Sequence, residues 1–269
     1  MLNRSVKSCQ VFGLIIKVMN NDIRKQKNIR LIILLSAIAA LLTVFVIISI
    51  IALSGASQAF DDGIYLRLIE LRNTPLNRFL FIIGFAGNAV VLVIAALAFE
   101  LFPKTRHRVG FKAALAVGLS PIVNIILKNI FQRPRPFDQL TTGTGTSFPS
   151  GHAFSSASFF VTVILFLLLN VKDKRILIPA VAACVLAPVI VSFCRVFLGA
   201  HWTTDTMAGM TLGTTMALTV HFFVWPLIKK LFRIITLKWS RLDIIYRFVF
   251  GAEEEEAIGE FISPDTKCG

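Results

Sequence analysis

The sequence predicts an all-α polytopic membrane protein with six transmembrane helices and both termini in the cytoplasm. Of its 269 residues, 55% are hydrophobic and only 16% are charged, whereas soluble domains contain about 25% charged residues. Long runs without a charged residue recur along the chain, and basic residues gather on alternate connections between them. Because lipid offers the backbone no hydrogen bonds, such spanning segments are helices, whose backbone groups bond within each segment.

Six runs supply the expected spans, since about 20 helical residues cross the hydrocarbon core of a bilayer. Five of the runs have 19 to 23 residues, and the third has only 15. Lys112 and Lys128 border that third run and can extend their ammonium groups to the membrane surface, so a span is still expected there. In chain order the runs are Leu31–Leu53, Phe79–Phe99, Ala113–Leu127, Ala153–Val171, Ile176–Cys194 and Thr206–Ile228.

The distribution of lysine and arginine gives the expected topology. With the N-terminus in the cytoplasm, the segments 1–30, 100–112, 172–175 and 229–269 lie inside and hold 21 of the 28 basic residues. This excess follows the positive-inside rule. Contacts with anionic lipid headgroups then account for the net charge of +13, and we expect no nucleic-acid partner.

One membrane domain is expected over residues 29–230, preceded by a basic cytoplasmic segment, 1–28. Met19 begins a run typical of the approach to a first membrane helix, so a start at that methionine stays open. Segment 54–78 is the longest external connection and has room for a short interfacial helix. Residues 231–269 are interpreted as an amphipathic segment on the inner leaflet followed by an acidic, disordered tail.

Neither a metal nor a cofactor is expected. The four cysteines, among them Cys194 at the end of the fifth run, form no paired motif such as CxxC. Carboxylates on the external side are few, with Asp61 and Asp62 in one connection and Asp138 in another. A phosphate site built on magnesium normally supplies carboxylates to hold the ion.

Three polar motifs interrupt the apolar chain, all on the expected external side. "KNIFQRPRP" covers residues 128–136, "PSGH" covers residues 149–152, and "CRVFLGAHWTTD" covers residues 194–205. Cations gathered at a membrane surface indicate an anion with several oxygens, and guanidinium groups fit phosphate well. Four of the seven external basic residues fall in these motifs: Lys128, Arg133, Arg135 and Arg195.

Two histidines add chemistry to this anion site. His201 and Asp205 are four residues apart, so at a helix start the carboxylate can orient one ring nitrogen. The other nitrogen is then left as a nucleophile or base. His152 follows Ser150 and Gly151 at the start of the fourth span, where free N–H groups and the helix dipole favour phosphate oxygens. There His152 can give a proton to a leaving oxygen.

At these residues the chain resembles the type-2 phosphatidic-acid phosphatase superfamily of membrane lipid phosphatases. The family pattern is a lysine and, after six residues, Arg-Pro; then Pro-Ser-Gly-His; then Ser-Arg, five residues, His, three residues and Asp. The serine before the arginine is replaced by Cys194, which is the departure from the pattern. The other positions are matched by Lys128, Arg135, Pro136, Pro149, Ser150, Gly151, His152, Arg195, His201 and Asp205.

This resemblance implies a metal-independent lipid phosphatase that forms a phosphohistidine on His201. Asp205 would orient His201, and His152 would protonate the leaving oxygen before water releases phosphate. Arg133 lies outside the pattern and is expected beside the site or at a lipid headgroup. The residues implied to hold phosphoryl oxygens are Lys128, Arg135, Ser150, Gly151 and Arg195.

The resemblance suggests undecaprenyl diphosphate, phosphatidylglycerophosphate or phosphatidic acid as substrate, cleaved at the external face of the cell membrane. Two rivals stay open: a phosphotransferase that uses the same site, and a transporter that only binds lipid phosphate. The pair of His201 and Asp205 argues against the transporter, because binding alone needs cations but no oriented nucleophile. The expected partners are the lipid phosphate and membrane lipids, and the sequence does not fix the oligomeric state.

Overall fold

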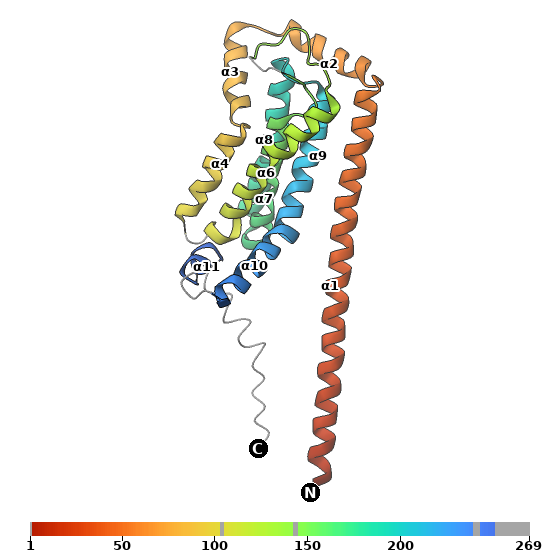
Figure 1. Ribbon diagram of the computed structural model, residues 1–269, viewed down its shortest axis with the longest axis vertical. Coiled ribbons are helices and arrows are strands. Elements are labelled where there is room, and N and C mark those ends of the chain that lie inside the picture. The colour runs from red at the N-terminus through yellow and green to blue at the C-terminus, as the bar shows by residue number, and fades with distance from the viewer. Residues whose placement is uncertain (1, 103–104, 142–144, 239–242, 251–269) are drawn as a thin grey trace.

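The computed structural model describes residues 2–102, 105–141, 145–238 and 243–250, and all regular secondary structure in these ranges is helical. Figure 1 shows the helices arranged as an elongated bundle. The elements are α1 (Leu2–Leu53), α2 (Gln58–Glu70), α3 (Thr74–Phe85), α4 (Ala89–Ala98), η1 (Phe99–Leu101), η2 (Arg106–Gly110), α6 (Phe111–Phe131), α7 (Gly151–Asn170), α8 (Lys174–Phe197), α9 (Thr203–Thr219), η3 (Val220–Val224), α10 (Trp225–Lys238) and α11 (Asp243–Phe250).

Five helical segments of the described chain are long and apolar enough to cross a membrane, and a bent pair of helices makes a sixth candidate. The prediction of an all-helical protein with several membrane spans is therefore confirmed. The beginning of α1 and the helices α10 and α11 lie at the same end of the bundle, opposite α2 (Figure 1). The five segments are Asn28–Leu53, Arg108–Phe131, Gly151–Asn170, Lys174–Phe197 and Thr203–Thr236.

The second predicted span, Phe79–Phe99, is wrong as a single helix. The chain forms α3, turns, and then forms α4 and η1 at an angle of 54°. Gly87 in the turn lies against α8, where a Cβ atom on this glycine would be 2.3 Å from Cγ1 of Val191. Asn88 then starts α4, because its side chain accepts a hydrogen bond of 2.9 Å from the N–H of Val90.

The last predicted span continues further than the sequence indicated. Its helix runs from α9 through the π-helical turn η3 into α10, so the basic amphipathic stretch extends the same helix. Helix α11 packs beside α10 through ring contacts of Tyr246 and Phe250 with Phe232. The predicted acidic tail, residues 251–269, lies outside the described residues.

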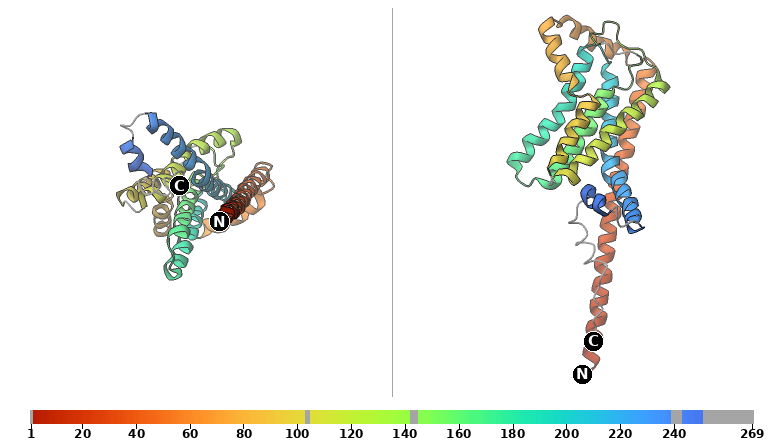
Figure 2. Two further views of the ribbon diagram at one scale, coloured as in Figure 1. Left: turned by 90° about the horizontal axis from the view of Figure 1, so that it is seen from below. Right: turned by 60° about the vertical axis from the view of Figure 1, so that its left-hand side comes forward.

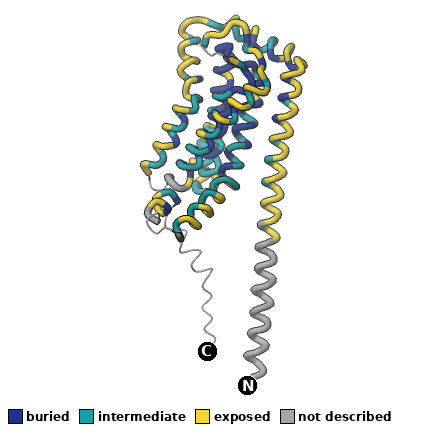
Figure 3. Tube along the Cα trace, viewed as in Figure 1, coloured by how far each residue is buried: buried dark blue, intermediate teal, exposed yellow. Residues whose placement is uncertain are grey.

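Helix α7 occupies the centre of the bundle, in contact with α6, α8 and α9. It packs most closely against α9, where a Cβ on Gly209 would lie 2.5 Å from the carbonyl oxygen of Ser150. Burial is concentrated on these inner helices, whereas the described side chains of α1 are mostly exposed (Figure 3). The closely packed centre of the molecule is therefore the contact between α7 and α9.

Helix α2 forms in the external connection, as the sequence suggested, and it crosses one end of the bundle (Figures 1 and 2). Tyr65 on its buried face donates a hydrogen bond of 2.8 Å to the carbonyl oxygen of Asp138. Arg72, just after α2, donates from Nε to the carbonyl oxygen of Phe197 at 2.9 Å. These bonds attach this end of α2 to the loop after the first polar motif and to the end of α8, which belongs to the third motif.

Candidate active site

The first polar motif begins in the last turn of α6 and continues into a loop. Helix α6 ends at Gln132, which adopts a left-handed conformation with φ 47°, and Pro134 and Pro136 keep the next residues from continuing a helix. The loop returns beside its own beginning, because the N–H of Ser147 donates to the carbonyl oxygen of Arg133 at 2.8 Å. Residues 133 and 147 are thus held side by side.

The second motif forms the start of α7, with Ser150 as its N-cap residue. The N–H of Ser150 donates a hydrogen bond of 3.0 Å to the carbonyl oxygen of Asp205, which joins the start of α7 to the start of α9. The hydroxyl of Ser150 is buried and has no partner among the described residues. A buried hydroxyl at the N-terminus of a helix is placed to contact an anion.

The third motif covers the end of α8 and the start of α9. Gly199 makes the turn between them with φ 70°, and a Cβ there would lie 2.6 Å from the hydroxyl of Tyr65. The turn brings the N–H of His201 to 3.3 Å from the carbonyl oxygen of Arg195. Asp205 lies in the first turn of α9, where its Oδ2 accepts a hydrogen bond of 2.9 Å from the N–H of Trp202.

His201 is almost completely buried, and its surroundings fix the ring. Its Nδ1 lies 2.7 Å from the carbonyl oxygen of Ser147 and 3.6 Å from Oδ2 of Asp205. A carbonyl oxygen can only accept a hydrogen bond, so Nδ1 carries the hydrogen and Nε2 has the free lone pair. The contact with Asp205 is too long for a good hydrogen bond, and the carboxylate therefore acts on the ring mainly through its charge.

Burial lowers the pKa of His201 from its ordinary value to about 4, and this effect outweighs the attraction of the imidazolium to Asp205. The nearby charges of Arg195 and Lys128 lower the pKa further. His201 is therefore neutral at pH 7. A neutral ring with hydrogen on Nδ1 presents Nε2 as a nucleophile.

Three cations lie near this histidine: Lys128 at the end of α6, Arg135 in the loop after α6 and Arg195 at the end of α8. Nζ of Lys128 donates to the carbonyl oxygen of Thr146 at 2.9 Å, and Nη1 of Arg135 donates to that of Ala200 at 2.8 Å. Nε of Arg195 is buried without a partner among the described residues. Burial lowers the pKa of Arg135, and Asp205 has the opposite effect on it.

The structure brings all eight sequence-predicted site residues together at the α2 end of the bundle. Lys128 interacts electrostatically with Arg135, Asp205 and Arg195. His152, in the first turn of α7, interacts in the same way with both arginines, with Lys128 and with His201. Ser150 and Gly151 directly precede His152. Cations from the ends of α6 and α8 and from the loop after α6 thus share one region with the two histidines.

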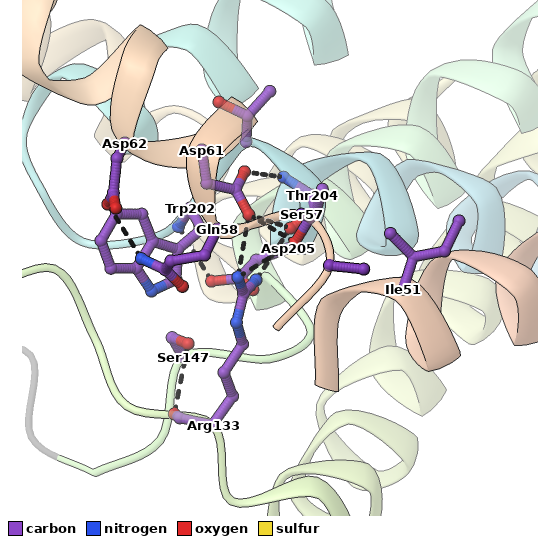
Figure 4. A network of polar contacts seen from close by, with 12 residues as sticks. Ile51, Ser57, Gln58, Asp61, Asp62, Arg133, Ser147, Trp202, Thr204 and Asp205 are labelled. Atoms are coloured by element: carbon purple, nitrogen blue, oxygen red, sulfur yellow. Dashed lines mark hydrogen bonds and ion pairs between the residues drawn. The ribbon is translucent and has the colours of Figure 1, made fainter. Parts of the chain in front are cut away.

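Arg133 was expected beside the site or at a lipid headgroup, and the structure gives it protein partners. Its guanidinium is buried, with Nη1 2.7 Å from Oδ1 of Asp205 and Nη2 2.8 Å from Oδ2 of Asp61 (Figure 4). Sequence reasoning left Asp61 in a separate connection and did not consider Ser147. The sequence signal for Asp61 was weak: a carboxylate on the apolar face of a short helix.

The side chain of Cys194, the departure from the family pattern, takes part in apolar packing. It is fully buried in an apolar cluster with Leu80, Phe197 and Leu198. A Cβ on Gly84 of α3 would be 3.1 Å from its Cβ atom. Cys194 therefore contributes to the packing of α3 against α8.

Comparison with known proteins agrees with this arrangement. The chain is 28% identical over 186 residues to phosphatidylglycerophosphatase B of Bacillus subtilis, covering 66% of this chain and 90% of that protein. It is also 28% identical over 186 residues to an undecaprenyl-diphosphatase of Sulfolobus acidocaldarius, covering 65% of this chain and 84% of that protein.

A solved structure shares the fold. The crystal structure of a transmembrane PAP2-type phosphatidylglycerolphosphate phosphatase from Bacillus subtilis superimposes with a TM-score of 0.62 at 26% identity, covering 70% of this chain and 96% of that one. The profile of the PAP2 superfamily matches residues 109–229, which include all three polar motifs. This chain is therefore a multi-pass membrane protein that is similar to the PAP2 superfamily over that segment.

Proposed function

We propose that this protein is a metal-independent lipid phosphatase that hydrolyses a lipid phosphate or diphosphate through a phosphohistidine intermediate. The observation that carries the proposal is the state of His201: buried, neutral and fixed with its Nε2 lone pair available. It lies next to Lys128 and Arg195. A nucleophile beside fixed cations suits attack on a phosphoryl group, whose negative charge the cations offset.

In the first step, Nε2 of His201 forms a bond to phosphorus while the bond from phosphorus to the lipid oxygen breaks. His152 gives a proton to that departing oxygen. In the second step, water gives a proton to His152 and attacks phosphorus, and the bond to His201 breaks. Both histidines return to their starting states, and inorganic phosphate leaves.

The phosphoryl oxygens would be held by groups that still have capacity for a ligand. The hydroxyl of Ser150 and Nε of Arg195 are buried without a partner among the described residues. Lys128, Arg135 and the backbone N–H of Gly151 complete the proposed set, since a helix N-terminus attracts anions. Such unsatisfied buried donors are costly unless a ligand uses them.

Hydrolysis is favoured over simple binding by the hydrogen bond between His201 and Ser147. A transporter for lipid phosphate needs cations, but it gains nothing from a buried imidazole held in one tautomer. The relatives named for phosphatidylglycerophosphate and undecaprenyl diphosphate suggest these two lipids as substrates. The family resemblance adds phosphatidic acid. The bundle then receives the lipid chains while the phosphate enters the polar end.

Phosphate release from a panel of these lipids by the purified protein in detergent tests the proposal. Turnover should persist in excess EDTA, because Lys128, Arg135 and Arg195 can offset phosphoryl charge without a divalent ion. Vanadate, which mimics five-coordinate phosphorus, should inhibit. Transfer to a second lipid or to a sugar, in place of release, would instead identify a phosphotransferase, and binding without turnover a transporter.

A further inference from the structure

Arg133 lies between two carboxylates, those of Asp61 and Asp205, that are far apart in the sequence. Asp61 and Asp205 are both fully buried, and the guanidinium between them is 5% exposed. The three side chains meet where α2 crosses the bundle, as Figure 4 shows. The family pattern quoted above contains neither Arg133 nor Asp61, so the role of this pair needs its own explanation.

Each oxygen of Asp205 has a different partner. Oδ1 accepts from Nη1 of Arg133 at 2.7 Å, and Oδ2 accepts from the N–H of Trp202 at 2.9 Å. Oδ2 is also the oxygen that lies 3.6 Å from Nδ1 of His201. By holding Oδ1, Arg133 keeps the other oxygen turned toward the imidazole.

Asp61 limits how far Arg133 neutralises the negative charge of Asp205. One guanidinium paired only with Asp205 would largely cancel the charge of that carboxylate. Shared with Asp61, it leaves two carboxylates against one cation, and a net negative charge remains beside His201. That charge stabilises the imidazolium that forms when Nε2 bonds to phosphorus and Nδ1 keeps its hydrogen.

Asp61 is itself held by the start of α9. Its Oδ1 accepts from the N–H of Thr204 at 3.0 Å, and its Oδ2 accepts from the hydroxyl of Thr204 at 2.7 Å and that of Ser57 at 3.0 Å. Thr204 also accepts from Arg133 at 2.8 Å. All these groups are buried, so the set is rigid and its geometry is passed on to Asp205.

We propose that Asp61 and Arg133 are positioning residues for phosphoryl transfer: together they fix the orientation and the charge of Asp205 at His201. This inference rests on the proposed function, because it concerns the nucleophile of that reaction. It assigns to α2, which lies outside the segment matched by the family profile, a part in the chemical step.

Asp61→Asn is the first test, with Asp62→Asn as its matched control. The two aspartates are adjacent on α2, but Asp62 accepts a hydrogen bond of 2.8 Å from Gln58 and is not bonded to Arg133 in Figure 4. Single-turnover labelling with a radioactive lipid phosphate separates two effects. A misfolded fraction lowers the amplitude of phosphoenzyme formation, whereas a displaced nucleophile lowers its rate constant.

For Asp61→Asn we expect the rate constant to fall roughly 100-fold, since small displacements of reacting groups cost about that much. KM should change little, and Asp62→Asn should behave as the wild type. Asp61→Glu keeps the charge and should recover part of the rate. This variant also tests the inference if Asp61→Asn does not fold.

Arg133→Lys is the second test, with Arg67→Gln on the exposed side of α2 as the control. A lysine can pair with one carboxylate at a time and has no planar fork, so the rate constant should fall at least tenfold with the substrate affinity retained. If the wild-type protein forms phosphoenzyme and the rate constants for Asp61→Asn and Asp62→Asn are equal, the positioning role is wrong while the proposed function stands. If the wild-type protein forms no phosphoenzyme with any lipid, the proposed function fails and the inference falls with it.

Discussion

At the residue scale, the imidazole of His201 is controlled by a backbone group as much as by a side chain. The sequence predicted that Asp205 orients the ring, because a spacing of four residues brings two helical side chains together. In the structure the carbonyl oxygen of Ser147 is the nearer partner of Nδ1, at 2.7 Å against 3.6 Å for Oδ2 of Asp205. A backbone contact between residues 54 positions apart leaves no signal in the pattern of side chains.

The low pKa of His201 predicts the acid limb of the activity profile. In the proposed mechanism the ring must be neutral to attack phosphorus, so kcat/KM should fall when pH drops far enough to protonate it. That midpoint should lie near the pKa of about 4 given by burial, well below the ordinary value of about 6.5 for a histidine. A substrate with an activated leaving group suits the measurement, since it depends least on His152. A midpoint above pH 6 would contradict the buried, neutral ring.

The same shift has a consequence for stability. Above about pH 6.5 the ring is neutral in both the folded and the unfolded chain. Its protonation then makes no contribution to the pH dependence of the free energy of unfolding. As pH falls from there toward 4, only the unfolded chain takes up the proton readily, so the folded state loses stability. Thermal unfolding in detergent at a series of pH values should show this decline, and it should be smaller in His201→Gln.

Substitution of His201 and substitution of His152 should have different effects on phosphoenzyme formation and activity. His201→Ala should abolish phosphoenzyme formation, because it removes the atom that we propose bonds to phosphorus. His152→Ala should still form phosphoenzyme, and it should lose more activity with a poor leaving group than with an activated one. Trapping of labelled phosphoenzyme by a rapid alkaline quench, in which the bond from phosphorus to nitrogen survives, distinguishes the two. Full labelling in His201→Ala would show that another residue is the nucleophile.

At the element scale, the site depends on the close approach of the first turns of α7 and α9. The N–H of Ser150 bonds to the carbonyl oxygen of Asp205, and Gly209 lets the two helices approach at that level. Hydrophobic runs predicted both helices, because an apolar run within one segment is enough to predict a membrane helix there. They did not predict the bend after α3, which depends on the contact of Gly87 with Val191 on α8.

Gly209→Ala should separate the two helix starts and impair the chemistry. The new Cβ would lie 2.5 Å from the carbonyl oxygen of Ser150, and this backbone atom cannot move without shifting α7. We expect roughly 1–3 kcal/mol of destabilisation from overpacking and a large loss of kcat. Gly118→Ala on α6 is the control, because a Cβ there meets nothing within 4 Å. Thermal unfolding and turnover of both variants check the prediction, and equal behaviour would contradict the close approach.

At the scale of the whole molecule, the polar groups divide between the two ends of the bundle. The end near α2 holds the three motifs, whereas basic residues such as Arg108, Lys172 and Lys229 lie near the ends of helices at the other end. The sequence could predict this division, because hydrophobic runs and charge counts are properties of the chain alone. It could not predict that Asp61 meets Arg133, 72 residues later, since only the tertiary fold brings α2 over the loop.

The charge division also predicts which end faces outside. Basic segments are retained in the cytoplasm, so the end with α2 and the candidate site should be external. A cysteine introduced at Gln139, which is exposed in the loop near the site, should react with a membrane-impermeant thiol reagent in intact cells. Lys172→Cys, exposed between α7 and α8, should react only after the cells are opened. Labelling of the parent protein gives the background from its own cysteines. The reverse pattern, with Lys172→Cys labelled in intact cells and Gln139→Cys protected, would place the site in the cytoplasm and contradict the topology.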